Sequence, residues 1–279
     1  MAETPLSDNA AVSPAVSPWG TTDAPAPGAA PGAAQPTARP ASPASEFAWG
    51  LVSTLLLAGW IALWAGPLGA VALVGGVFVH EFGHLMVINW AGAGPSRIRI
   101  IPFFGGAATM SRIPDTDFKG VLIALAGPAF GLVAAAPFWA LAAFTGQRAW
   151  LAGAFYVGAL NLINLAPAAP LDGAKAFGPV LGRIHPQLER AALVIIALAA
   201  LAWAIGRGSF LFAIVIAFGA LRAFAAGGVR PAARPLSLVE WLASVALYAG
   251  VVGACAAVTF FAANGAGITL AIPRFGVVR

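Results

Sequence analysis

The chain has 279 residues, of which 60% are hydrophobic and 9% are charged. Soluble domains usually carry about 25% charged residues, so this composition excludes an ordinary soluble globular protein. The net charge of +5 does not indicate a nucleic-acid partner, because the basic residues cluster between long apolar stretches rather than along one face. We therefore expect an all-α polytopic membrane protein that lies in the lipid bilayer.

Residues 1–45 differ sharply from the rest of the chain. They are rich in Ala, Pro, Ser, Thr and Gly and hold few large apolar side chains. Such a segment buries too little apolar surface to offset the entropy of ordering it, so we expect a disordered tail. The tail also lacks the basic start and the continuous apolar run of a signal peptide.

From Phe47 onward the sequence predicts seven candidate membrane spans, each close to the roughly 20 residues that cross a bilayer as a helix. They are residues 47–66, 70–91, 120–144, 150–169, 191–206, 209–226 and 238–262. The first two are joined only by a tight turn at Gly66-Pro67. The fifth is short and could be tilted or interfacial, so we expect six or seven transmembrane helices.

The distribution of Lys and Arg predicts an orientation. If the N-terminus is inside, the outer side holds only Arg148, Arg207, Arg274 and Arg279, and the inner side holds the other eleven Lys and Arg residues. Cytoplasmic loops carry such an excess, so we expect a cytoplasmic tail and a second span that runs from outside to inside. The high Ala, Gly and Pro content suits a bacterial protein, which would place it in the inner (plasma) membrane.

The second span contains the segment H-E-F-G-H at residues 80–84. An ionisable side chain in mid-span costs about 2.5–3.5 kcal/mol on insertion scales, so this apolar chain should hold such groups only with a partner. His80 and His84 lie four residues apart on one helix face and can direct ring nitrogens at one metal ion. Glu81 lies beside them as an acid/base for a water molecule. The alternative is a polar contact between helices without a metal.

A catalytic zinc usually takes three protein ligands, so a third is needed. His185 falls in a charged loop, Arg183 to Arg190, and is expected at the surface. Asp115 and Asp117 precede an apolar segment, where solvated or helix-capping residues are common.

Asp172 is the third ligand that we favour. It follows the fourth span after Pro167 and Pro170, which would end the helix and leave non-helical backbone at membrane depth. In the predicted orientation, the fourth span ends on the inner side of the membrane. The second span, which carries His80 and His84, runs towards the same side. A solvated loop aspartate remains the alternative.

These motifs resemble the site-2 protease family of intramembrane zinc metalloproteases. The resemblance rests on H-E-F-G-H at 80–84 and on N-x-x-P-x-x-P-L-D-G at 164–173. Phe104-Gly105-Gly106 with Met110, and Ala126-Gly127-Pro128, are further matches. The resemblance covers roughly residues 70–190.

The resemblance implies a catalytic core of three helices with Zn²⁺ held by His80, His84 and Asp172. It also implies that Glu81 is the catalytic acid/base and that the substrate is a transmembrane protein, cut within its membrane helix. We accordingly divide the chain into the tail, a catalytic core with one preceding helix at 46–190, and further transmembrane helices at 191–279. The loops between the spans are too short for the inserted PDZ domain that many family members carry.

Residues 97–110 alternate polar and apolar side chains and then carry Gly105-Gly106, a pattern that predicts a short membrane-associated β-hairpin. Its edge could accept an unwound substrate by strand addition, or the hairpin could only pack against the core. Asn161 and Asn164 share a helix face, and their amides could bond between helices. The resemblance favours Asn164 as a donor to the substrate or to the developing oxyanion.

Two other functions remain open from the sequence. One is a membrane protein that binds or transports a metal without hydrolysis, and the other is an inactive relative that only binds transmembrane partners. A carrier has no need for Glu81 between the ligands, and an inactive relative has no need to keep all four polar residues. The sequence predicts neither the substrate's identity nor the oligomeric state.

Overall fold

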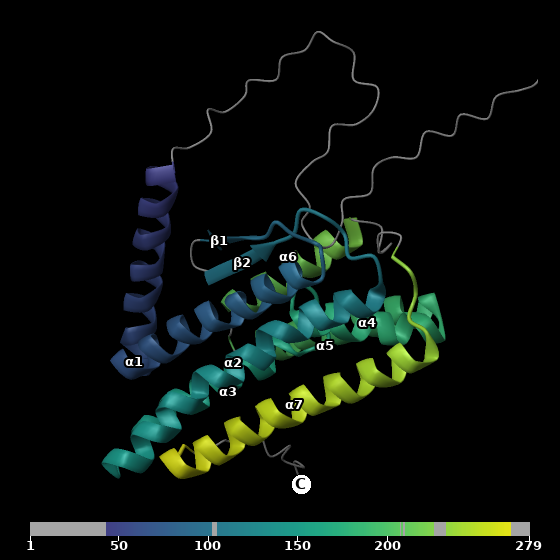
Figure 1. Cartoon of the computed structure of the whole chain (residues 1–279). Helices are drawn as coiled ribbons and strands as arrows, with labels where there is room; N and C mark the ends of the chain where they lie inside the picture. The colour runs from purple at the N-terminus through teal and green to yellow at the C-terminus, as the bar shows by residue number, and fades with distance from the viewer. Residues whose placement is uncertain (1–42, 102–104, 207, 209, 226–232, 269–279) are drawn as a thin grey trace, which may run out of the picture.

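The structure is a computed structural model that describes residues 43–101, 105–206, 208, 210–225 and 233–268. Nearly all of the predicted tail and Phe104 therefore lie outside the described residues. The described chain is mostly helical, with seven helices and two short strands (Figure 1). Four of its helices are long and apolar enough to cross a membrane: Ala48–Trp90, Asp117–Thr145, Pro186–Gly206 and Leu238–Ala266.

Helix α1, Pro43–Trp90, contains both of the first two predicted spans. Its arms meet at Gly66, whose φ of 72° and ψ of 173° are not helical. Glycine adopts this positive φ without a steric penalty, and Pro67, which follows, has no N–H to donate back into the first arm. Figure 1 shows the two arms leaving this kink in different directions.

Helices α2 (Asp117–Thr145) and α3 (Trp150–Asn164) pack against α1 and against each other, and α7 (Leu238–Ala266) packs against α2 and α3. Thr116 caps α2 by accepting from the Lys119 amide, and Gly146 ends the helix with a φ of 70°. The short connection to α3 makes α2 and α3 antiparallel neighbours. A reciprocal pair of Ser237 and Glu240 hydrogen bonds begins α7.

One cluster of core side chains lies where α2, the end of α3, α4 and α7 meet. Its fully buried side chains include Val121, Leu165, Ala176 and Cys255. Small residues let the helices approach closely: a Cβ added to Gly83 of α1 would lie 2.5 Å from the Ala126 carbonyl oxygen of α2. In a lipid bilayer the hydrophobic effect does not drive helices together, so close packing through small residues stabilises their association instead.

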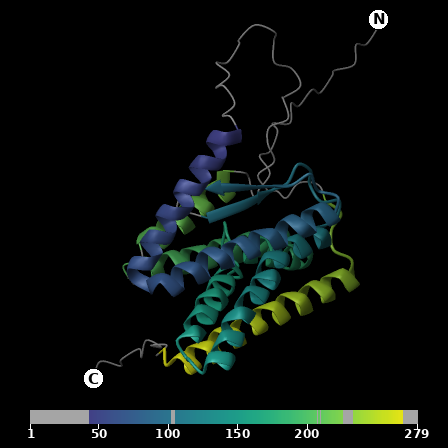
Figure 2. The same ribbon diagram turned by 60° about the vertical axis from the view of Figure 1, so that its left-hand side comes forward.

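Strands β1 (Arg97–Ile101) and β2 (Gly105–Thr109) pair antiparallel, with Arg97 opposite Thr109 and Ile101 opposite Gly105. They occupy the segment in which the sequence predicts a hairpin, although residues 102–104, where its turn would fall, lie outside the described residues. Both strands lie beside α1 (Figure 2).

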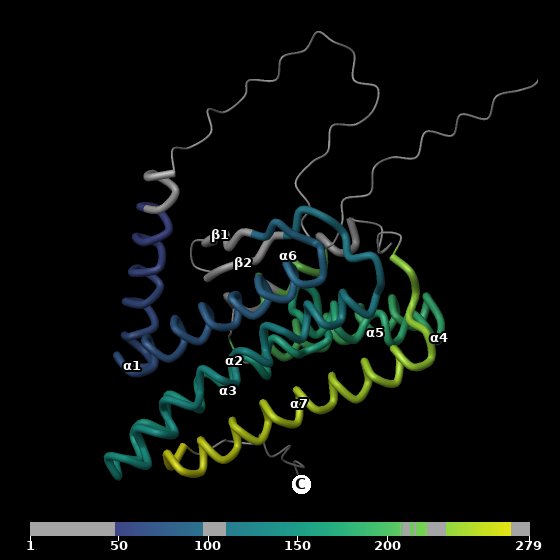
Figure 3. The backbone as a smooth tube through the Cα atoms, viewed as in Figure 1, coloured from purple at the N-terminus to yellow at the C-terminus, as the bar shows by residue number. Residues whose placement is uncertain are grey.

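Helix α4, Asp172–Ile184, has no counterpart among the predicted elements. The predicted charged loop at Arg183–Arg190 is wrong, because α5 (Pro186–Gly206) begins directly after one extended residue, His185. Proline suits the first turn of a helix, where its missing N–H has no partner to lose. Helix α6 (Phe210–Ala225) then lies against α5, as the backbone trace in Figure 3 shows.

The predicted count of six or seven spans is not confirmed. Two predicted spans share α1, and α6 has only 16 residues. The span predicted at 150–169 is shorter than expected: α3 ends at Asn164 after 15 residues, because Pro167 and Pro170 follow. At 1.5 Å per residue, α3 is about 22 Å long and falls short of the roughly 30 Å hydrocarbon core.

Candidate metal centre

His80 and His84 lie one turn apart on the second arm of α1, and both are buried. Their rings meet edge to face with centroids 4.8 Å apart. The Nε2 atoms of the two rings are 3.1 Å apart, so both imidazoles point at the same place. The spacing of four residues on a helix produces this convergence, as the sequence predicts.

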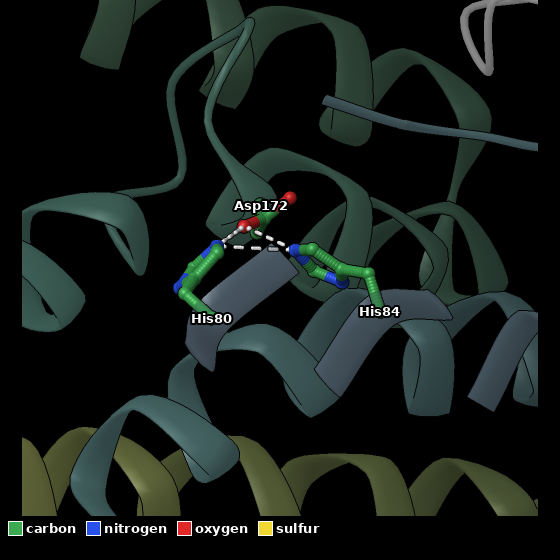
Figure 4. A group of neighbouring side chains, drawn as sticks. All are labelled: His80, His84 and Asp172. Atoms are coloured by element: carbon green, nitrogen blue, oxygen red, sulfur yellow. Dashed lines mark hydrogen bonds and ion pairs between the residues drawn. The ribbon is translucent and has the colours of Figure 1, made fainter. Parts of the chain in front are cut away.

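Asp172 reaches the same place from the first residue of α4 (Figure 4). Its Oδ2 lies 3.0 Å from Nε2 of His80 and 3.1 Å from Nε2 of His84. The side chain is buried although it follows a non-helical connection after α3. The structure thus brings the two histidines and the favoured third ligand together.

Gly173 is required by the close turn at this point. A Cβ added to it would collide with the carbonyl oxygens of Leu165 and Ala166, which belong to the connection that follows α3. Any side chain here would push α4 away from the end of α3 and carry Asp172 with it. In the Asp-Gly pair of the sequence, Asp172 is therefore the candidate ligand, and the position after it has no room for a side chain.

The three side chains fit a zinc ion. In a tetrahedral site with bonds of about 2.0–2.1 Å, ligand atoms lie about 3.3–3.4 Å apart. The distances of 3.0–3.1 Å between the two Nε2 atoms and Oδ2 are close to this value. Two imidazoles and one carboxylate are a common ligand set of catalytic zinc, which leaves one coordination position open.

Each histidine is held from behind by a hydrogen bond. Nδ1 of His80 lies 2.9 Å from Oδ1 of Asn161 on α3, and Nδ1 of His84 lies 2.7 Å from the Ile123 carbonyl oxygen on α2. Outer bonds of this kind fix the ring orientation of metal-binding histidines. The sequence predicts for Asn161 only a possible interhelical hydrogen bond, and its placement behind a ligand was missed.

Gly127 of α2 supplies the space that the two rings occupy. A Cβ added to it would lie 2.7 Å from Nε2 of His80 and closer still to Nε2 of His84. One turn further along, Gly131 leaves room for the Asn161 amide in the same way. The signal for these contacts was present in the sequence as two glycines four residues apart, but their partners depend on how the helices pack.

Two further charged residues flank the ligands. Glu81 follows His80 on α1 at a half-buried position. Lys175 lies one turn beyond Asp172, with Nζ 3.3 Å from Oδ1. The two carboxylate oxygens of Asp172 therefore have different partners: Oδ2 faces the histidines and Oδ1 faces the Lys175 ammonium group.

The predicted substrate-binding residues, and the residues expected to be solvated, are not among the three converging side chains. The Asn164 amide donates to the Leu160 carbonyl of its own helix at 3.2 Å. Gly105 and Gly106 begin β2. His185 is exposed between α4 and α5, and Asp115 is an exposed partner of Lys119. Neither His185 nor Asp115 belongs to the group of potential metal ligands found in the described part of the chain.

The fold and the site together define a class: a helical membrane protein with a buried His-His-Asp metal centre. Residues 68–149 match the model of peptidase family M50. The resemblance to the site-2 proteases is thereby confirmed over residues 68–149.

Similar proteins agree with this assignment. The chain is 32% identical over 198 residues to "Putative zinc metalloprotease Rip3" of Mycobacterium tuberculosis, an alignment of 66% of this chain and 47% of that protein. It is 29% identical over 137 residues to "Putative zinc metalloprotease sll0528" of Synechocystis, covering 46% of this chain and 35% of the relative. The chain thus spans less than half the length of these relatives. No solved structure gives a significant match.

Proposed function

We propose that the chain is an intramembrane zinc metalloprotease that hydrolyses peptide bonds within or near the transmembrane helices of protein substrates. The observation that carries the proposal is the convergence of His80, His84 and Asp172 on one point, with Glu81 next to His80 on α1. The relatives named as zinc metalloproteases support the choice of metal and reaction. The burial of the site among apolar helices supports a substrate that lies in the membrane.

Zinc, when bound, supplies a Lewis acid that makes water a nucleophile at neutral pH. The residues of the chain supply the proton transfer and the charge balance. Glu81 accepts a proton from the attacking water and passes it to the leaving amine. Lys175 balances the charge of Asp172 on the oxygen that faces away from the histidines. Asn164 is proposed to donate to the substrate once that substrate is bound.

The substrate must be unwound locally, because a helix hides its peptide bonds in its own hydrogen bonds. We propose that β2 receives the unwound segment by strand addition. Gly105 and Gly106 have no side chains that would keep a second backbone away. Proline in place of Gly106 should lower cleavage and leave zinc content unchanged; full cleavage by this variant would remove the strand from the proposal.

The experiment that tests the function compares native protein with Glu81→Gln. Cleavage of a membrane-embedded test helix should fall by about 10²-fold or more in the variant, because the acid/base is lost. Zinc content should be retained, because Glu81 is not one of the three ligands. A metal carrier would be unaffected by this substitution in its metal transport, and no cleavage by either form would support that alternative.

A further inference from the structure

A chain of hydrogen bonds runs from the backbone of α3 to His80. The Asn161 amide donates from Nδ2 to the Val157 carbonyl oxygen at 2.8 Å, and its Oδ1 lies 2.9 Å from Nδ1 of His80. Val157 and Asn161 are completely buried, and His80 is 4% exposed. Water therefore has little access to replace any bond of this chain.

The Val157 carbonyl determines which atom donates and which accepts in both hydrogen bonds. A carbonyl oxygen only accepts, so the Asn161 atom that faces it must be the amide nitrogen. The other amide atom, Oδ1, then faces His80 and also only accepts. The proton between Asn161 and His80 must consequently lie on Nδ1, which leaves the lone pair of Nε2 directed at the metal centre.

The space for Asn161 is provided by α2. A Cβ added to Gly131 would collide with Oδ1, Cγ and Nδ2 of Asn161. The amide is thus enclosed between α2 and its own helix, where it cannot rotate without losing both bonds. The corresponding acceptor behind His84 is the Ile123 backbone carbonyl, which no substitution removes.

We infer that Asn161 is a positioning residue that fixes the tautomer and ring direction of His80 for metal binding. This inference rests on the proposed zinc site. Asn161 does not touch the metal or the substrate; it acts through His80. Nothing in the zinc-binding motif itself identifies this residue, because it lies on a different helix, 81 positions along the chain.

The test measures zinc affinity of the full-length chain in detergent by competition with a chelator. Asn161→Leu, which has a similar shape and no acceptor, should weaken zinc binding by about 10–100-fold. Asn161→Asp retains an acceptor for Nδ1–H and should recover most of that loss. Asn164→Leu is the matched control: its amide bonds only to Leu160 in the described contacts, so zinc affinity should be unchanged.

A second readout follows the proton itself. The chain has three histidines, so ¹⁵N-histidine labelling gives few signals to assign. In the zinc-loaded native protein, the His80 Nδ1–H resonance should be protected from exchange. In Asn161→Leu it should exchange faster, whereas that of His84 should remain as in the native protein because its acceptor is the backbone.

Native zinc affinity and unchanged His80 exchange in folded Asn161→Leu would overturn the inference. Equal losses in Asn161→Leu and Asn161→Asp would also overturn it, since space filling alone would then explain the effect. If the leucine variant does not fold, Asn161→Ala replaces it with the same expectation. Because zinc affinity is measured without cleavage, a failure of the proposed protease activity would leave this result intact.

Discussion

Each metal-binding histidine has an acceptor behind it and open space in front of it. Asn161 and the Ile123 carbonyl accept from the two Nδ1 atoms, and Gly127 leaves the Nε2 atoms unobstructed. The site therefore depends on residues of α2 and α3 as much as on the histidines of α1. Gly127, which has no side chain, is one of the residues on which the site depends.

Gly127→Ala tests this at the scale of one methyl group. The added Cβ would overlap the Nε2 atoms of His80 and His84, so zinc affinity should fall by about tenfold or more. Gly75→Ala is the control, because a Cβ there meets nothing within 4 Å. The control should keep native zinc affinity and gain up to about 1 kcal/mol in helix stability. Equal zinc affinity in both variants would contradict the packing described here.

Much of the site could be predicted from the sequence. His80 and His84 follow from helix periodicity. Asp172 was favoured as the third ligand because two prolines end the preceding helix, with a solvated loop aspartate as the alternative. Asn161 was not assigned its role, because its partner is decided by the rotation of α3 against α1, which the apolar sequence of α3 does not encode locally. For the same reason the contacts of Gly127 could not be predicted from its place in the Ala126-Gly127-Pro128 motif.

At the scale of elements, α7 holds the segment that carries Asp172. The Tyr248 hydroxyl donates to the Leu165 carbonyl oxygen at 2.6 Å, just after α3 ends, where helix carbonyls lack partners. The Tyr248 ring stacks on Phe177 of α4 with centroids 5.1 Å apart. Trp241 donates from Nε1 to the Val180 carbonyl at 2.9 Å. Helix α7 thus contacts both sides of the turn that presents the ligand.

Tyr248→Phe should therefore affect the metal centre as well as stability. Loss of the bond to Leu165 should lower the free energy of unfolding by about 1–2 kcal/mol, because a carbonyl away from water loses its partner. Zinc affinity should fall several-fold, because Asp172 becomes less firmly placed. Tyr156→Phe is the control, since Tyr156 packs against Trp64 on α1 instead. Thermal unfolding and chelator competition measure both effects; native zinc affinity in Tyr248→Phe would separate α7 from the site.

Helices α5, α6 and α7 also show what the sequence alone does not predict at this scale. Their hydrophobicity predicts spans at 191–206, 209–226 and 238–262, and the described residues of these ranges lie in α5, α6 and α7. Hydrophobicity alone does not distinguish a helix that only faces lipid from one that supports the site. Helix α4 was missed because it is short and follows two prolines that indicate a loop.

Across the whole molecule, one end of the helix bundle is joined by polar contacts. Lys119 donates to the Ala91 carbonyl at the end of α1 and pairs with Asp115 at 2.8 Å, which lowers the pKa of the Asp115 carboxyl. The Arg234 backbone bonds to residues on both sides of Thr116, and its guanidinium pairs with Glu240. These basic residues gather at the end that the charge distribution assigns to the cytoplasm. The orientation itself stays a prediction.

The central claim is that His80, His84 and Asp172 form the zinc site of a protease. The most direct measurement is the zinc content of the purified full-length chain, combined with cleavage of a membrane-embedded test helix before and after chelation. We expect about one zinc per chain, loss of cleavage on chelation, recovery on addition of zinc, and neither zinc nor cleavage in Asp172→Ala. A native chain without zinc, or cleavage that persists without it, would contradict the account.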